Sequence, residues 1–156
     1  MITITESEGV VSDQDERIKV LNCTDVPRMH WLVKNENWAA ALNVNQSDNR
    51  PAIYIRDNRV FLGVEQGIFI LDVESGKLVN EVSDVSFVQW IEEDVPTCVI
   101  FSAEDEVITI GNNGQLLWRK GMPDIIKTMD IVNGRLVIND MSGGQYSYNV
   151  KDGSAA

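Results

Sequence analysis

The residues of this chain that could do acid–base chemistry are six carboxylates around the apolar run at Val99. They form two clusters, Glu92, Glu93 and Asp94 before the run and Glu104, Asp105 and Glu106 after it. Two carboxyl groups facing each other can cleave a glycosidic bond, which requires both clusters to lie on one side of the fold. Because turn tips are also where solvated charge belongs, we expect no catalytic pair. Any role of these residues would be contact with a partner.

Nucleophilic and metal-binding arrangements are also missing from the sequence. His30 is the only histidine, and no GxSxG-type serine occurs for it to activate. Cys23 and Cys98 are distant from each other and from His30 in the chain, so neither a CxxC pair nor a zinc spacing is present. We expect the two cysteines to be small buried side chains and His30 to be packed or at a strand edge. The sequence therefore predicts no enzyme activity, no cofactor and no metal.

The charge balance restricts the class of partner. The chain has 24 acidic and 13 basic residues, a formal net charge of -11. Repulsion disfavours binding to a nucleic-acid backbone or an anionic membrane, so we expect neither. A protein partner, and a basic one in particular, fits this charge. No apolar run approaches the roughly 20 residues of a membrane span, and the first six residues lack a secretion-signal pattern, so we expect a cytoplasmic protein.

Tryptophan is the other residue type that could mark a binding face. The four tryptophans, Trp31, Trp38, Trp90 and Trp118, are the largest apolar side chains. Most should serve the core, and an exposed one would indicate a contact surface. Trp38 is the tryptophan that we include among the candidate partner-binding residues.

The elements that must position these residues are short strands. Runs such as Ala52–Ile55, Val60–Val64 and Ile68–Leu71 are each closed by a turn signal, and the pattern continues to the C-terminus. No stretch of ten or more residues keeps a helical period, although residues 37–42 have the propensity for a short helix. We predict an all-β chain with a single domain over residues 1–156 and a mobile acidic loop at 6–16.

The turn glycines reveal a repeat. Gly76, Gly114 and Gly153 are 38 and 39 residues apart, a period typical of four-stranded propeller blades. One period before Gly76 stands Asn37, and asparagine is the residue that best replaces glycine at a left-handed corner. The length corresponds to about four units of antiparallel β-meander, the first of them irregular.

At the second unit the sequence resembles the repeat of quinoprotein-like β-propellers. The segment 59–78 contains Asp72, Ser75, Gly76 and Lys77 at the positions of the family's Asp and Thr/Ser-Gly-Lys turn. The family's blade-docking tryptophan falls at Asn80 in this unit and at Trp118 in the next. The resemblance implies a propeller-like architecture, in degenerate form, from Ala52 onward. The quinone chemistry of the family needs a larger ring and a pocket that cannot be placed here, so we expect no cofactor.

Closure of such an array can occur in two ways. The strand-like segment Met1–Thr5 could join the last unit and close the ring within one chain. Alternatively, two chains could pair their edges as a homodimer, or the units could form a β-sandwich. A monomer and a homodimer both remain open.

Three functions are compatible with this architecture. The first is a non-catalytic protein-interaction module. A specific version is an acidic immunity or antitoxin-type protein that neutralises a basic toxin. The third is a propeller that binds or cleaves a sugar or small metabolite, which would require acidic groups with raised pKa values to converge on one site.

Overall fold

The computed structural model describes residues 1–7, 18–22, 29–44, 50–92 and 94–156. The chain divides into two compact units, Met1–Glu81 and Val82–Ala156. Each unit contains two small sheets, and the described residues contain no helix. The single domain expected from the sequence stays a prediction.

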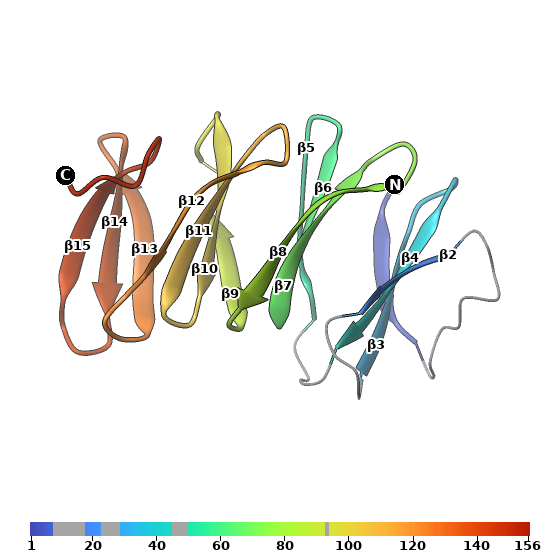
Figure 1. The fold of residues 1–156 in the computed structure, drawn as a ribbon, viewed down its shortest axis with the longest axis horizontal. Coiled ribbons are helices and arrows are strands. Elements are labelled where there is room, and N and C mark those ends of the chain that lie inside the picture. Colours follow the sequence, from blue (N-terminus) through green and yellow to red (C-terminus); the bar gives the residue numbers. More distant parts are fainter. Residues whose placement is uncertain (8–17, 23–28, 45–49, 93) are drawn as a thin grey trace. The chain divides into compact units, whose positions relative to one another are not determined.

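The first unit is built from two four-stranded sheets (Figure 1). One sheet has the order β1-β3-β4-β2, and the other has the order β5-β6-β7-β8. The strands are β1 (Thr3–Glu6), β2 (Ile18–Asn22), β3 (Met29–Lys34), β4 (Ala39–Val44), β5 (Ala52–Arg56), β6 (Arg59–Val64), β7 (Gln66–Asp72) and β8 (Leu78–Val85), of which β8 continues past the unit boundary. Strand β2 runs parallel to β4, whereas the other printed registers of these sheets are antiparallel.

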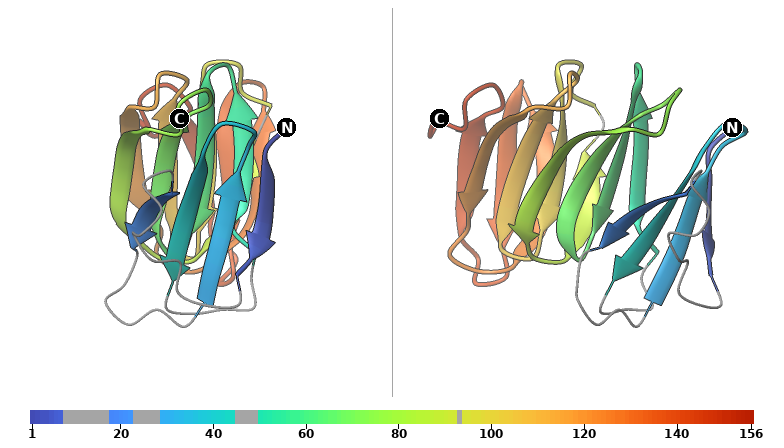
Figure 2. Two further views of the ribbon diagram at one scale, coloured as in Figure 1. Left: turned by 90° about the vertical axis from the view of Figure 1, so that its right-hand side faces the viewer. Right: turned by 45° about the vertical axis from the view of Figure 1, so that its right-hand side comes forward.

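The core of the first unit lies between these two sheets. Val33 and Leu42 of the first sheet are fully buried with Leu62 and Leu71 of the second. The apolar run Ile68–Leu71 of β7 is at most 2% exposed, as expected for a strand covered on both faces. The continuous apolar runs of the sequence therefore mark the central strands correctly. The views in Figure 2 show both sheets, the first in blue tones and the second in green.

The second unit contains a four-stranded sheet and a three-stranded sheet. The orders are β12-β11-β10-β9 and β13-β14-β15. The strands are β9 (Val88–Glu92), β10 (Cys98–Ala103), β11 (Glu106–Gly111), β12 (Leu116–Gly121), β13 (Ile126–Val132), β14 (Arg135–Asp140) and β15 (Gln145–Asn149). Ile100 and Val107 pack with Leu136 and Ile138 to form one core between the two sheets.

Glycine occupies the three predicted corners in a left-handed conformation. The φ angles of Gly76, Gly114 and Gly153 are 66°, 88° and 67°, which confirms the repeat. Asn37 is not among the residues with positive φ, so its prediction as an equivalent corner is wrong. The short helix proposed for residues 37–42 is also wrong, because β4 begins at Ala39 and pairs along its length with β3.

Each unit docks a tryptophan on a glycine corner. The indole N–H of Trp38 donates to the Val73 carbonyl at 2.8 Å, and a Cβ at Gly76 would lie 2.5 Å from the Trp38 ring. Trp38 is 7% exposed. This burial does not fit the predicted partner contact, and we withdraw Trp38 from the candidate residues.

The N-terminal segment takes a different partner from the one predicted. Strand β1 pairs antiparallel with β3 of its own unit, from Thr3 opposite Lys34 to Glu6 opposite Trp31. The prediction that Met1–Thr5 adds to the last unit is therefore wrong. Glu6, placed by the sequence in a mobile loop, belongs to β1, and residues 8–16 of that loop lie outside the described residues. Closure by a homodimer stays a prediction.

Candidate functional site

The two acidic clusters lie at opposite ends of one strand. Glu92 is the last residue of β9 and Asp94 belongs to the connection between β9 and β10, whereas Glu104 and Asp105 belong to the turn after β10. Strand β10 has six residues, so it separates the two connections by about 17 Å. The clusters therefore do not meet as a catalytic pair, and Glu93 lies outside the described residues.

Within the second cluster, Glu106 already has a partner. Its carboxylate accepts two hydrogen bonds from Arg119, at 2.5 and 2.8 Å. The guanidinium also donates to the carbonyls of Ser83 and Asp84. The hydrogen bond to Glu106 raises the pKa of Arg119, which stays charged. Glu106 thus forms a structural ion pair with Arg119, while Glu104 and Asp105 are exposed.

Three loops at this end of the second unit are joined by backbone hydrogen bonds. The amide of Met122 donates to the Asp105 carbonyl and that of Ile126 to the Glu104 carbonyl, both at 2.6 Å, and the Met141 amide donates to the Ile125 carbonyl at 2.9 Å. We call residues 104–105, 122–125 and 141–144 the three-loop face. Because the links are main-chain, the loops hold one another whatever their side chains do.

The side chains of the three-loop face combine exposed apolar groups with negative charge. Ile125 is 44% exposed and Met141 is 62% exposed, and their backbones are hydrogen-bonded to each other. Glu104, Asp105 and Asp124 supply three carboxylates, and the three loops contain no lysine or arginine. Exposed apolar residues beside charged residues are typical of a contact surface.

The third loop is held by a buried carboxylate. Asp140 is 1% exposed and accepts hydrogen bonds from the Ser142 hydroxyl, the Gly144 amide and the Tyr146 hydroxyl, at 2.9, 2.6 and 3.0 Å. Burial alone would raise the pKa of Asp140, but these three donors outweigh it and lower the pKa. The hydrogen bond between the Tyr146 hydroxyl and Asp140 raises the pKa of Tyr146. Asp140 therefore fixes the turn that carries Met141.

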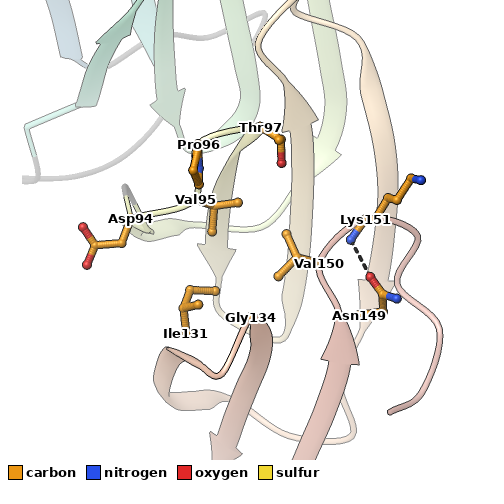
Figure 3. Close-up of a pocket in the computed structure, with 9 residues that line it drawn as sticks. All are labelled: Asp94, Val95, Pro96, Thr97, Ile131, Gly134, Asn149, Val150 and Lys151. Carbon is orange, nitrogen blue, oxygen red and sulfur yellow. Dashed lines mark hydrogen bonds between the residues drawn. The ribbon is translucent and has the colours of Figure 1, made fainter.

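A pocket of about 290 Å³ lies at the opposite end of the second unit (Figure 3). Its walls come from three separate segments: Asp94–Thr97 before β10, Ile131 and Gly134 of the β13–β14 hairpin, and Asn149–Lys151 at the end of β15. Figure 3 shows the side chains of Val95, Ile131 and Val150 gathered around it. We call this feature the apolar pocket. It is at the lower limit of the roughly 300–1,000 Å³ found for small-molecule sites.

The remaining chemistry-bearing residues take structural positions. His30 is 9% exposed, and its Nδ1 lies 2.7 Å from Oδ1 of Asn43 across β3 and β4. Cys98 is buried, and Cys23 is outside the described residues. No group of three histidine, cysteine or acidic side chains in the described part of the chain could hold a metal ion. The same residues include no helix able to cross a membrane.

Comparison with known proteins shows the fold. No family model matches the chain, and no curated protein matches it. Among solved structures, the chain is similar to the computationally designed Ika4 protein, with 18% identity and a TM-score of 0.55 over 71% of this chain and 72% of that chain.

Two longer structures give the same result. The computationally designed Ika8 protein is 17% identical over 80% of this chain and 41% of its own, with a TM-score of 0.55. BamB from Moraxella catarrhalis is 16% identical over 81% of this chain and 45% of its own, also with a TM-score of 0.55. The chain thus spans under half the length of these two proteins. The fold is a small propeller-like array of β-sheets, which confirms the predicted architecture.

Sequence reasoning missed the apolar members of both sites. Ile125 begins the apolar run 125–132 and was grouped with that strand, and Met141, which lies between the run 135–138 and the turn 142–144, was not singled out. The pocket residues Thr97 and Lys151 come from connections far apart in the chain, and no local pattern joins them. The acidic turns, in contrast, could have been separated from sequence alone, because successive turns of a meander alternate between the two ends of the sheet.

Proposed function

We propose that this chain is a non-catalytic protein-interaction module that binds a basic partner protein on its three-loop face. The observation that supports the proposal most is the exposed pair Ile125 and Met141 beside three carboxylates on loops fixed by backbone hydrogen bonds. A rigid surface loses little conformational entropy on binding, which favours affinity.

The charge of the surface determines the class of partner. The carboxylates of Glu104, Asp105 and Asp124 would accelerate encounter with a positively charged protein and would be screened by salt. An immunity or antitoxin-type protein acting on a basic toxin is one version of this function. A cytoplasmic location, where such a partner would be met, is part of the proposal.

The competing function, cleavage of a sugar, has less support. It requires converging carboxyl groups with raised pKa values. The acidic clusters are on opposite ends of β10, and the pKa values of Asp72, Asp140 and Asp152 are lowered, in each case by hydrogen bonds from their own turns. The resemblance of Asp72, Ser75 and Gly76 to the quinoprotein-like repeat stays a proposal about architecture and not about ancestry, and hydrogen bonds from the Ser75 amide and hydroxyl to Asp72 tie that turn together.

The experiment compares capture by the chain and by two variants with the same net charge. The test variant combines Glu104→Gln, Asp105→Asn and Asp124→Asn. The control combines Glu36→Gln, Glu74→Gln and Glu81→Gln, three exposed residues of the first unit. Proteins captured from an extract of the natural host are identified by mass spectrometry, purified and titrated. We expect a basic partner whose affinity falls in the test variant and with salt, and is retained in the control.

A second variant separates the apolar contribution from the charge. Ile125→Ser with Met141→Ser should weaken the same partner by at least about tenfold at any salt concentration, since two apolar anchors are lost. Equal binding by the wild type, the charge variant and the serine variant would overturn the proposed surface. A partner that is acidic would overturn the proposed class.

A further inference from the structure

The apolar pocket of the second unit is distinct from the three-loop face. The pocket lies at the end of the sheets where β9 joins β10, and the three-loop face lies where β10 joins β11. Binding at the pocket is therefore independent of the function proposed for the three-loop face.

The lining of the pocket indicates an apolar occupant of the size of one side chain. Val95 and Val150 are each 7% exposed, and Ile131 is partly exposed at the wall. The volume of about 290 Å³ is small for a cofactor or an oligosaccharide. One aliphatic side chain of a peptide would be enclosed by these three residues.

The rim of the pocket carries opposite charges on opposite sides. Figure 3 places the carboxylate of Asp94 on one side and the ammonium of Lys151 on the other, both directed away from the apolar lining. Glu92 stands with Asp94, since its carboxylate accepts the Asp94 amide at 3.0 Å. Arg135 lies on the same side of the pocket as Lys151. It is opposite the pocket residue Asn149 in the pairing of β14 with β15, and directly opposite residues lie on the same face of a sheet. The nearby Asp152 carboxylate is engaged by Ser154.

We propose that the apolar pocket binds an extended peptide segment in which one aliphatic residue is flanked by a basic residue and an acidic residue. The aliphatic side chain occupies the space between Val95, Ile131 and Val150. The basic neighbour lies toward Asp94, and the acidic neighbour lies toward Lys151. The charge polarity of the rim thus selects the segment, while the pocket supplies the anchor.

The test is a titration of the full chain, labelled with ¹⁵N, by blocked five-residue peptides. The sequences Gly-Lys-Leu-Glu-Gly and Gly-Glu-Leu-Lys-Gly cover both chain directions, with Gly-Lys-Leu-Lys-Gly, Gly-Glu-Leu-Glu-Gly and Gly-Lys-Gly-Glu-Gly as references. We expect saturable shifts at the amides of Thr97, Gly134 and Lys151, with a Kd of about 1 mM for the better of the first two peptides. The two same-charge peptides should bind about 1.4- to 5-fold more weakly, the effect of one exposed ion pair. The leucine-free peptide should give no saturation.

Variants of the protein connect the effect to named side chains. Thr97→Tyr fills the pocket mouth and should weaken binding at least about tenfold, whereas Thr5→Tyr, the same exchange at an exposed position of β1, should not change it. Asp94→Asn should weaken the peptides that contain both leucine and lysine and should not weaken Gly-Glu-Leu-Glu-Gly, because the glutamate that lies toward Asp94 loses a repulsive neighbour. Lys151→Gln should weaken the peptides that contain both leucine and glutamate and should not weaken Gly-Lys-Leu-Lys-Gly.

Three results would overturn the inference. The first is an absence of saturable shifts up to about 10 mM for every peptide. The second is saturation by the leucine-free peptide, which would remove the anchor. The third is shifts confined to Glu104, Ile125 and Met141, which would assign peptide binding to the three-loop face instead.

Discussion

Trp38 in the first unit and Trp118 in the second make the same kind of contact, although the local backbone structure around them differs. The indole N–H of Trp38 donates to the Val73 carbonyl and that of Trp118 to the Val150 carbonyl, both at 2.8 Å. Each ring also covers the glycine that stands three residues after the accepting valine, Gly76 or Gly153. Trp38 follows a turn in which the Asn35 side chain accepts from two amides, whereas Trp118 lies within β12. The contact therefore depends on the glycine corner rather than on the element that carries the tryptophan.

The two contacts differ in what surrounds them. Trp38 is 7% exposed and shares the Val73 carbonyl with the Asn35 amide group. Trp118 is half-buried, and its neighbour Lys120 donates to the Gly153 carbonyl at 2.8 Å and lies 4.3 Å from the Tyr148 ring centroid. The second contact thus has less burial and one additional cationic tie.

Removing the two indole rings should give the largest loss of stability, and the loss should differ between Trp38 and Trp118. Trp38→Ala should lower the free energy of unfolding by about 3–5 kcal/mol, and Trp118→Ala by about 2–3 kcal/mol because less of the ring is buried. Urea unfolding gives the totals, and hydrogen exchange assigns the loss to each unit. Leu117→Ala, exposed on the same strand as Trp118, is the control and should cost under about 0.5 kcal/mol. An equal loss at both tryptophans would contradict the expected dependence on the burial of the ring.

Substituting the two glycine corners, Gly76 and Gly153, should cost a similar amount of stability in both units. Gly76→Ala and Gly153→Ala place a Cβ 2.5 and 2.7 Å from the Trp38 and Trp118 rings, at φ angles of +66° and +67°. Backbone strain and overpacking together should cost about 2–4 kcal/mol at each site in thermal or urea unfolding.

A matched control for this pair is Gly134→Ala. Gly134 has a φ of +75°, but a Cβ there would meet nothing within 4 Å, so only the backbone strain of about 1–2 kcal/mol should appear. In a Trp118→Ala background, Gly153→Ala should fall to the cost of Gly134→Ala. If it retains its full cost there, the indole is not the cause.

The smallest expected effect concerns the turn carboxylates of the two units. Hydrogen bonds from the Ser75 amide and hydroxyl lower the pKa of Asp72, and for Asp140 the three donors of its turn outweigh burial. A carboxyl whose folded pKa is lowered stabilises the fold above its unfolded pKa of about 3.9, and that stabilisation is lost as the pH falls below about 4.

Unfolding measured from pH 7 to pH 2 checks this effect. Asp72→Asn and Asp140→Asn should each be less stable than the wild type at pH 7, and the difference should shrink below pH 4. A difference that is constant with pH would mean that the carboxylate charge contributes nothing and that only the shape of the side chain matters.

The fold was predictable from the sequence where the signal is local. The turn-bounded runs around Val60, Ile68 and Val107 became strands, and Gly76, Gly114 and Gly153 became left-handed corners, because strand alternation and positive φ depend on neighbouring residues. The partners of β1 and β2 were not predictable, since nothing in a strand of four or five residues specifies which distant strand it pairs with.

The candidate sites were predictable only in part. Glu104 and Asp105 were found as turn carboxylates, but their neighbours Ile125 and Met141 were not, because exposure of an apolar residue depends on how three loops meet. The helical propensity of residues 37–42 is not realised, because pairing of β4 with β3 outweighs the propensity of three alanines.

Val150 belongs to two features at once, because its side chain lines the apolar pocket and its carbonyl accepts the indole N–H of Trp118. Anything that enters the pocket and shifts this residue will change the polarity around one tryptophan. In a chain that keeps Trp118 as its only indole, the wavelength of the emitted light would report occupancy without any attached dye.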